Sequence, residues 1–144
     1  MNEFMKQKVK IARARYNIMF MAVLSIINIL LISSEKTLTM PFSSSIATYA
    51  TVIGINASKE NADESYRLIG FAIASFVILA LLLCHLFSKA KPFWLFIAFS
   101  LVAADTAVLL TFSFVAEAFQ LLTMLDLALH LLTLFYIFSA VKAH

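Results

Sequence analysis

The sequence predicts an all-α integral membrane protein, a four-helix bundle with one further helix in its first outer loop. The chain has 144 residues, 62% of them hydrophobic and 13% charged, and its mean hydropathy is +0.95. A soluble domain of this length could not bury so much apolar surface. Four apolar runs are long enough to cross a hydrocarbon layer about 30 Å thick, which needs roughly 20 helical residues. No run alternates as a barrel strand does.

The four predicted spans form a single transmembrane domain that covers residues 1–144. We place them at residues 16–33, 68–87, 93–115 and 119–141. The second and third spans are joined by a short link, and the third and fourth by a shorter one. Each of these two pairs is therefore expected to pack as antiparallel neighbours.

The basic residues are distributed unequally between the two sides of the predicted membrane. Eight Lys and Arg residues fall on the side of the two termini, and three fall on the opposite side. Because cytoplasmic loops carry this excess of basic residues, we expect both termini to be cytoplasmic. The expected location is the cell membrane, as a multi-pass protein of a bacterial inner membrane. The net charge of +3 comes from basic residues that are distributed as the topology requires, so it does not indicate nucleic-acid binding. The expected partner is the lipid bilayer.

The first outer loop, residues 34–67, is much longer than a hairpin needs. Within it, residues 41–55 are apolar with small hydroxyl residues, begin with Pro, and are too short to cross a membrane. They are expected to form either a re-entrant half-helix, whose ends need protein or water partners, or an interfacial helix on the outer surface. The sequence leaves this choice open.

The fourth span carries four polar residues on one face: Thr123, Asp126, His130 and Thr133. At 100° per residue they fall within about 80° of one another. An acid and an imidazole inside a hydrocarbon-length helix are costly unless they face protein or water. This face is therefore predicted to point into the bundle.

Two further polar residues lie at similar depth in other spans. At 1.5 Å per residue, Asn28 and Asp105 each lie about 18 Å from the cytoplasmic end of their span. This depth is comparable to that of Asp126 and His130. We therefore predict one outward-facing pocket formed by these four residues, with Thr123 and Thr133 on its wall.

A face of small residues on the third span points away from Asp105. It consists of Ser100, Ala103, Ala104, Ala107 and Thr111. Small residues let another helix approach closely, so this face is predicted to be a packing surface.

The predicted pocket admits several chemistries. Its acids and imidazole suit binding of a small solute, lipid or ion, in a transport-related or accessory subunit. Asp105, Asp126 and His130 also suit a divalent metal such as Zn²⁺, and hence an intramembrane metal-dependent enzyme. A third possibility is a structural or regulatory partner of a larger membrane complex, or a homo-oligomer, in which these groups are a structural network. No nucleotide-binding, zinc-protease, EF-hand or CxxC motif is present.

Three local patterns resemble those of small, uncharacterised four-span integral membrane proteins of Gram-positive bacteria, some of them labelled transporter permeases. They are PFSSSIATYATVIG at residues 41–54, Ala104-Asp105-Thr106, and the C-terminal pattern of Leu125-Asp126, His130, Tyr136 and Val141-Lys142-Ala143. The resemblance covers most of the chain. It implies that Asp105, Asp126 and His130 belong to a shared pattern, and it implies no particular activity.

Overall fold

The computed structural model describes residues 3–34, 39–115 and 120–143, and these residues form helices without any strand. The helices are α1 (Glu3–Ser33), α2 (Ser45–Asn61), α3 (Ser65–Phe87), α4 (Pro92–Val115) and α5 (Leu121–Val141). Within the described ranges, α1, α3, α4 and α5 are long and apolar enough to cross a membrane. The predicted all-α fold with four spanning helices is therefore confirmed.

Two helices extend beyond the apolar runs that predicted them. The first begins at Glu3, because the basic residues before the apolar run are good helix formers and continue the same helix. The third begins at Ser65, where Asp63 accepts a hydrogen bond from the Ser65 N–H. The predicted start of the fourth span, at residue 119, lies outside the described residues.

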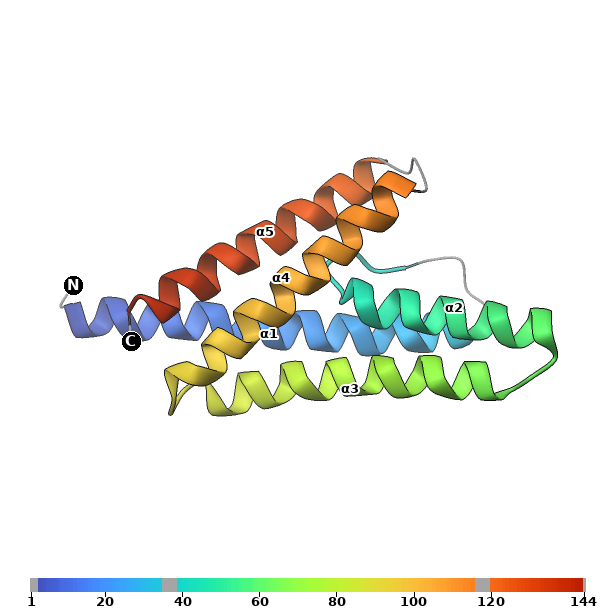
Figure 1. Ribbon diagram of the computed structural model, residues 1–144. Coiled ribbons are helices and arrows are strands. Elements are labelled where there is room, and N and C mark those ends of the chain that lie inside the picture. The colour runs from blue at the N-terminus through green and yellow to red at the C-terminus, as the bar shows by residue number, and fades with distance from the viewer. Residues whose placement is uncertain (1–2, 35–38, 116–119, 144) are drawn as a thin grey trace.

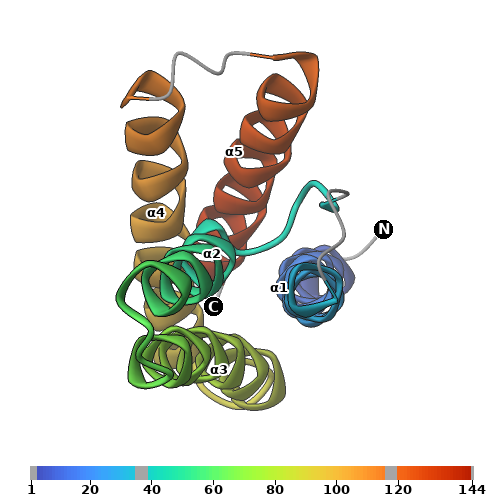
Figure 2. The same ribbon diagram turned by 90° about the vertical axis from the view of Figure 1, so that its right-hand side faces the viewer.

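The four long helices are arranged as two layers (Figures 1 and 2). The first layer holds α1 and α3, and the antiparallel pair α4 and α5 is inclined across it. The start of α1 and the end of α5 lie at the same end of the bundle (Figure 1), as an even number of crossings requires.

Apolar side chains fill the interior and also cover the outside. The core includes Ile18, Leu81 and Leu95, each at most 1% exposed. On the outer faces, Phe76 is 73% exposed and Phe114 is 68% exposed. So extensive an apolar exterior is untypical of a soluble monomer and matches a lipid-facing surface. These features are those of a small polytopic membrane protein.

The shorter helix α2 lies beside α3 (Figure 2), and the two backbones approach closely at two glycines. A Cβ atom added to Gly70 would lie 2.5 Å from the carbonyl oxygen of Ala50, and one added to Gly54 would lie 2.8 Å from that of Tyr66. Glycine is needed at both positions because any side chain would strike backbone atoms.

The contacts between α2 and α3 also show which part of α3 lies beside each end of α2. Ala47, in its first turn, packs on Ala74 and Ile78 in the middle of α3, whereas Gly54 faces Gly70 nearer the start of α3. The two helices are antiparallel, so α2 starts beside the middle of α3 and ends beside its beginning (Figure 1).

The start of α2 differs from the sequence-based expectation. Pro41 was expected at the first helical position, but the helix begins at Ser45. Ser44 is the N-cap, since its hydroxyl oxygen accepts a hydrogen bond from the Ala47 N–H. Residues 39–44 instead form a turn that leads into the helix.

Candidate functional site

Asp105, in the middle of α4, binds the N-terminus of α2. Its side chain is buried, and its Oδ1 atom accepts hydrogen bonds from the Ser44 hydroxyl at 2.6 Å and the Ile46 N–H at 2.8 Å. Its Oδ2 atom accepts one from the Ser45 N–H at 2.9 Å. The first N–H groups of a helix have no partner within the helix, and the helix dipole favours an anion beside them. A carboxylate from α4 thus satisfies the start of α2 inside the bundle.

His130, on α5, lies between two carboxylates. Its Nε2 atom is 2.9 Å from Oδ2 of Asp105, and its Nδ1 atom is 3.2 Å from Oδ1 of Asp126 and 2.9 Å from the Asp126 carbonyl oxygen. The ring is fully buried. Both ring nitrogens therefore face oxygen acceptors, an arrangement that the doubly protonated imidazolium satisfies completely because both nitrogens then donate.

Asp126 holds the turn that precedes α2. Its Oδ1 atom accepts a hydrogen bond from the Phe42 N–H at 2.6 Å. The φ angle of Phe42 is 64°, a left-handed conformation that costs a residue with a side chain about 1–2 kcal/mol. The buried Phe42 ring packs against Phe20 on α1 and edge-on to His130. The carboxylate and this packing together maintain the strained backbone.

Two residues of α1 bind the same turn from the other side. The Asn28 side chain accepts a hydrogen bond from the Met40 N–H and donates to the Met40 carbonyl and the Ser43 hydroxyl, at 2.6, 3.0 and 2.6 Å. The Ser25 hydroxyl accepts from the Ser44 N–H at 2.7 Å. Side chains from α1, α4 and α5 therefore converge on residues 40–46, the entry turn of α2.

A small cavity of about 50 Å³ lies beside the entry turn. It is lined by Asn28, Thr39, Met40, Ser43, Ser45, Thr48, Tyr49 and Asp126. Many of these residues carry side-chain oxygens, and Asp126 supplies the one carboxylate among them. A water molecule occupies roughly 30 Å³ in the liquid, so the cavity holds one or two water-sized ligands.

The six predicted site residues do not all belong to this arrangement. The structure brings Asp105, Asp126 and His130 into direct contact, and Asn28 joins them through the entry turn. Thr133 is buried, but its hydroxyl donates to the Leu129 carbonyl of its own helix. For Thr123, no hydrogen bond to the cluster is found among the residues that the structure describes.

The three predicted metal ligands are not arranged around a common point. The imidazole lies between the two acids, so each carboxylate meets a different ring nitrogen. Across residues 3–34, 39–115 and 120–143, no three His, Cys, Asp or Glu side chains have a geometry that could hold a metal ion. The three side chains form a chain of contacts with His130 at its centre.

The sequence analysis missed the polar groups of the entry turn itself. Ser43 and Ser44 are central to the network, together with the backbone N–H groups of Ser45 and Ile46. The run of serines before an apolar stretch is a typical N-cap signal and could have located the start of α2. Nothing in the sequence shows that the acceptor for this start is Asp105, since that contact is made only by the tertiary packing.

Comparison with known proteins finds neither a family nor a structural neighbour. No family model matches the sequence, no curated protein matches it, and no solved structure is detectably similar.

Proposed function

We propose that this small polytopic membrane protein binds a small cation in the oxygen-lined cavity beside Asp126, in a transport-related or accessory role. The size and lining of the cavity carry the proposal. Of the ligands that the sequence left open, a single ion fits a volume of about 50 Å³, whereas most of a lipid or an organic solute would lie outside it. Hydroxyl, carbonyl and carboxylate oxygens are the ligands that hard cations take.

The charges of the cluster support a cationic ligand. With both carboxylates ionised and His130 doubly protonated, the cluster has two negative charges and one positive charge. The remaining single negative charge is costly inside a membrane protein unless a cation balances it. Oδ2 of Asp126 has no hydrogen-bond partner among the described residues, so it is available to a cation in the cavity.

We place α2 as a re-entrant half-helix, with both chain termini in the cytoplasm and the cavity in the outer half of the membrane. The support is that α2 begins beside the middle of α3, which is long enough to span. Non-helical backbone at membrane depth is tolerated only where protein satisfies it, and Asp105, Asp126 and Asn28 do so for the entry turn.

Cysteine labelling tests this placement of α2. In a Cys84→Ala background, single cysteines at Val52 and at Ile53, which is 52% exposed from the bundle, should react slowly with a membrane-impermeant thiol reagent added to intact cells. A cysteine at the exposed Glu60, near the end of the same helix, should react rapidly and serves as the control. Rapid labelling at all three positions would show that α2 is exposed to water along its length.

Cation binding is tested by the thermal stability of the purified protein. A ligand at 100 times its dissociation constant stabilises the folded state by about 2.7 kcal/mol, so NaCl should raise the unfolding temperature more than choline chloride of equal ionic strength. Asp126→Asn should abolish this difference, and Thr48→Val, which removes one cavity hydroxyl, should weaken it. Glu60→Gln removes an exposed acid from α2 and should leave the difference intact. An equal response to both salts in the unmodified protein would rule out the cation site.

A role as a structural or regulatory subunit is the second candidate, because the small-residue face of α4 is unexpectedly open. The sequence predicts a packing surface on this face, and within the described bundle four of its residues are exposed: Ser100, Ala104, Ala107 and Thr111. A second copy or another membrane subunit would be able to approach closely there. Co-purification of a stoichiometric membrane partner would support this role. No observation of comparable weight favours intramembrane metal-dependent catalysis.

A further inference from the structure

A second pocket lies between α1 and α5, at the end of the bundle that holds both termini. It has a volume of about 250 Å³ and is lined by Lys10, Arg13, Phe135, Tyr136 and Ser139. Lys10 and Arg13 are exposed, and neither forms an ion pair with any acid in the described part of the chain. Two uncompensated bases beside two hydroxyl groups make this pocket suited to an anion, and in particular to a phosphate.

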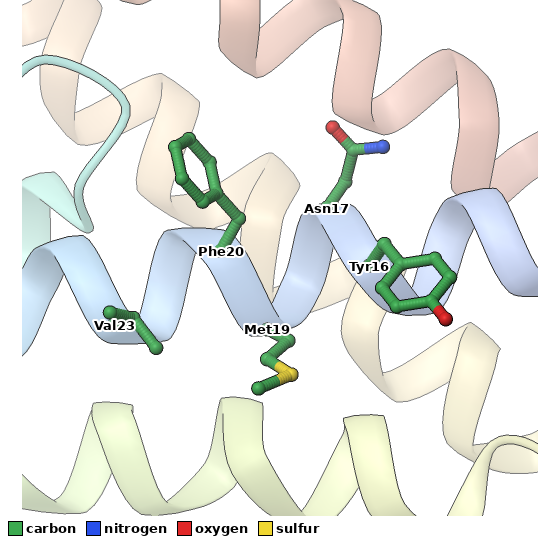
Figure 3. Close-up of a pocket in the computed structure, with 5 residues that line it drawn as sticks. All are labelled: Tyr16, Asn17, Met19, Phe20 and Val23. Carbon is green, nitrogen blue, oxygen red and sulfur yellow. The ribbon is translucent and has the colours of Figure 1, made fainter.

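An apolar groove of about 380 Å³ follows this pocket along α1 toward the middle of the bundle. It is lined by Tyr16, Asn17, Met19, Phe20 and Val23. Figure 3 shows that Asn17 points toward α5, and the Phe20 ring packs on Phe42 of the entry turn. The Asn17 side chain also donates a hydrogen bond to the Arg13 carbonyl, so the basic pocket and the apolar groove adjoin on one helix face.

We propose that the pocket and the groove together bind one anionic phospholipid. Lys10 and Arg13 hold its phosphate, the Tyr136 and Ser139 hydroxyls bind its headgroup oxygens, and one acyl chain lies in the groove. The positions match the depth of each part of a lipid. The two bases precede the apolar run of α1, and the hydroxyls lie in the last turns of α5, where headgroups are expected.

The combination of charge and groove favours a lipid over an acidic protein segment. A peptide that paired with Lys10 and Arg13 would need no apolar channel, and its backbone would be unsatisfied where the groove runs beside the hydrophobic part of α1. An acyl chain has no hydrogen-bonding groups that such a groove would leave unsatisfied. The site is distinct from the cavity at Asp126, which is lined by different residues.

The experiment uses a tryptophan reporter in the groove. In a Trp94→Phe background, the exposed Tyr16 is replaced by Trp, and the protein in zwitterionic detergent is titrated with phosphatidylglycerol or phosphatidylcholine that carries brominated acyl chains. Brominated phosphatidylglycerol should quench the reporter at a much lower mole fraction than brominated phosphatidylcholine. Lys10→Gln/Arg13→Gln should raise the phosphatidylglycerol mole fraction at half-quenching roughly 30-fold, because each base near an anionic headgroup contributes about 1 kcal/mol.

Two controls make the result specific to the pocket. Lys8→Gln/Lys89→Gln removes the same amount of charge from two exposed residues that do not line the pocket. Both lie at the end of the bundle that holds the termini. This double variant should change the half-quenching point by less than threefold. Tyr136→Phe should weaken phosphatidylglycerol binding without affecting phosphatidylcholine. Equal quenching by the two lipids, or equal effects of the two double variants, would overturn the proposal. Displacement of the brominated lipid by soluble glycerol phosphate would also overturn it, because the ligand would then be a free phosphate.

Discussion

Replacing Asp105 with Ala is expected to lower the free energy of unfolding by about 3–5 kcal/mol, the cost of removing one partner from a buried ion pair. The carboxylate accepts hydrogen bonds from three groups at the start of α2 and lies against His130, and Ala leaves all of them without an acceptor. Reversible unfolding in mixed micelles, followed by circular dichroism, measures the loss.

Two comparisons make the Asp105 prediction precise. Asp105→Asn keeps the shape of the side chain but places an NH₂ group against other donors, so it should fall between the unmodified protein and Asp105→Ala. Glu60→Ala removes an exposed acid from α2 and should change stability by no more than about 0.5 kcal/mol. If Asp105→Ala stays within about 1 kcal/mol of the unmodified protein, the contact with the start of α2 contributes little and the network is incidental.

Gly70→Val should cost about 3 kcal/mol, at the upper end of what overpacking costs in protein interiors. The added Cβ would lie 2.5 Å from the Ala50 carbonyl oxygen, so α2 would have to move away from α3. That movement would also pull Ser45 and Ile46 from Asp105, and cation-dependent stabilisation should fall together with stability. Ala72→Val is the matched control, because Ala72 lies on the exposed side of the same helix. Equal losses in the two variants would contradict the close packing of α2 on α3.

The helical periodicity and the depth of each residue predict the spanning helices and the polar residues that meet between them. Asp126 and His130 share a face because they are four residues apart, and Asp105 lies at similar depth on the preceding helix. Such arithmetic gives depth and face, but not which helices are neighbours. Depth and face therefore predict a cluster of side chains. They do not show that a backbone segment, the entry turn, lies at the centre of this cluster.

The entry turn and the close helix packing are hard to predict for separate physical reasons. Phe42 adopts a left-handed backbone that its residue type disfavours, so tertiary contacts and not local preference determine it. Gly54 and Gly70 are the two glycines of the chain and face each other across the interface between α2 and α3, but nothing in the sequence shows that they pair. On α4, by contrast, a clear small-residue pattern marks a face that the described bundle leaves exposed.

The entry turn also constrains the order in which the protein can be made. Its N–H donors, at Phe42, Ser45 and Ile46, are synthesised before their acceptors, Asp126 and Asp105. At about 5–20 residues per second, the ribosome completes the donors several seconds before α5 exists. During that interval these donors need water or the insertion machinery, because lipid satisfies none of them. The contacts of the entry turn with α1 can form early, but those with Asp105 and Asp126 can be completed only after α4 and α5 have been made.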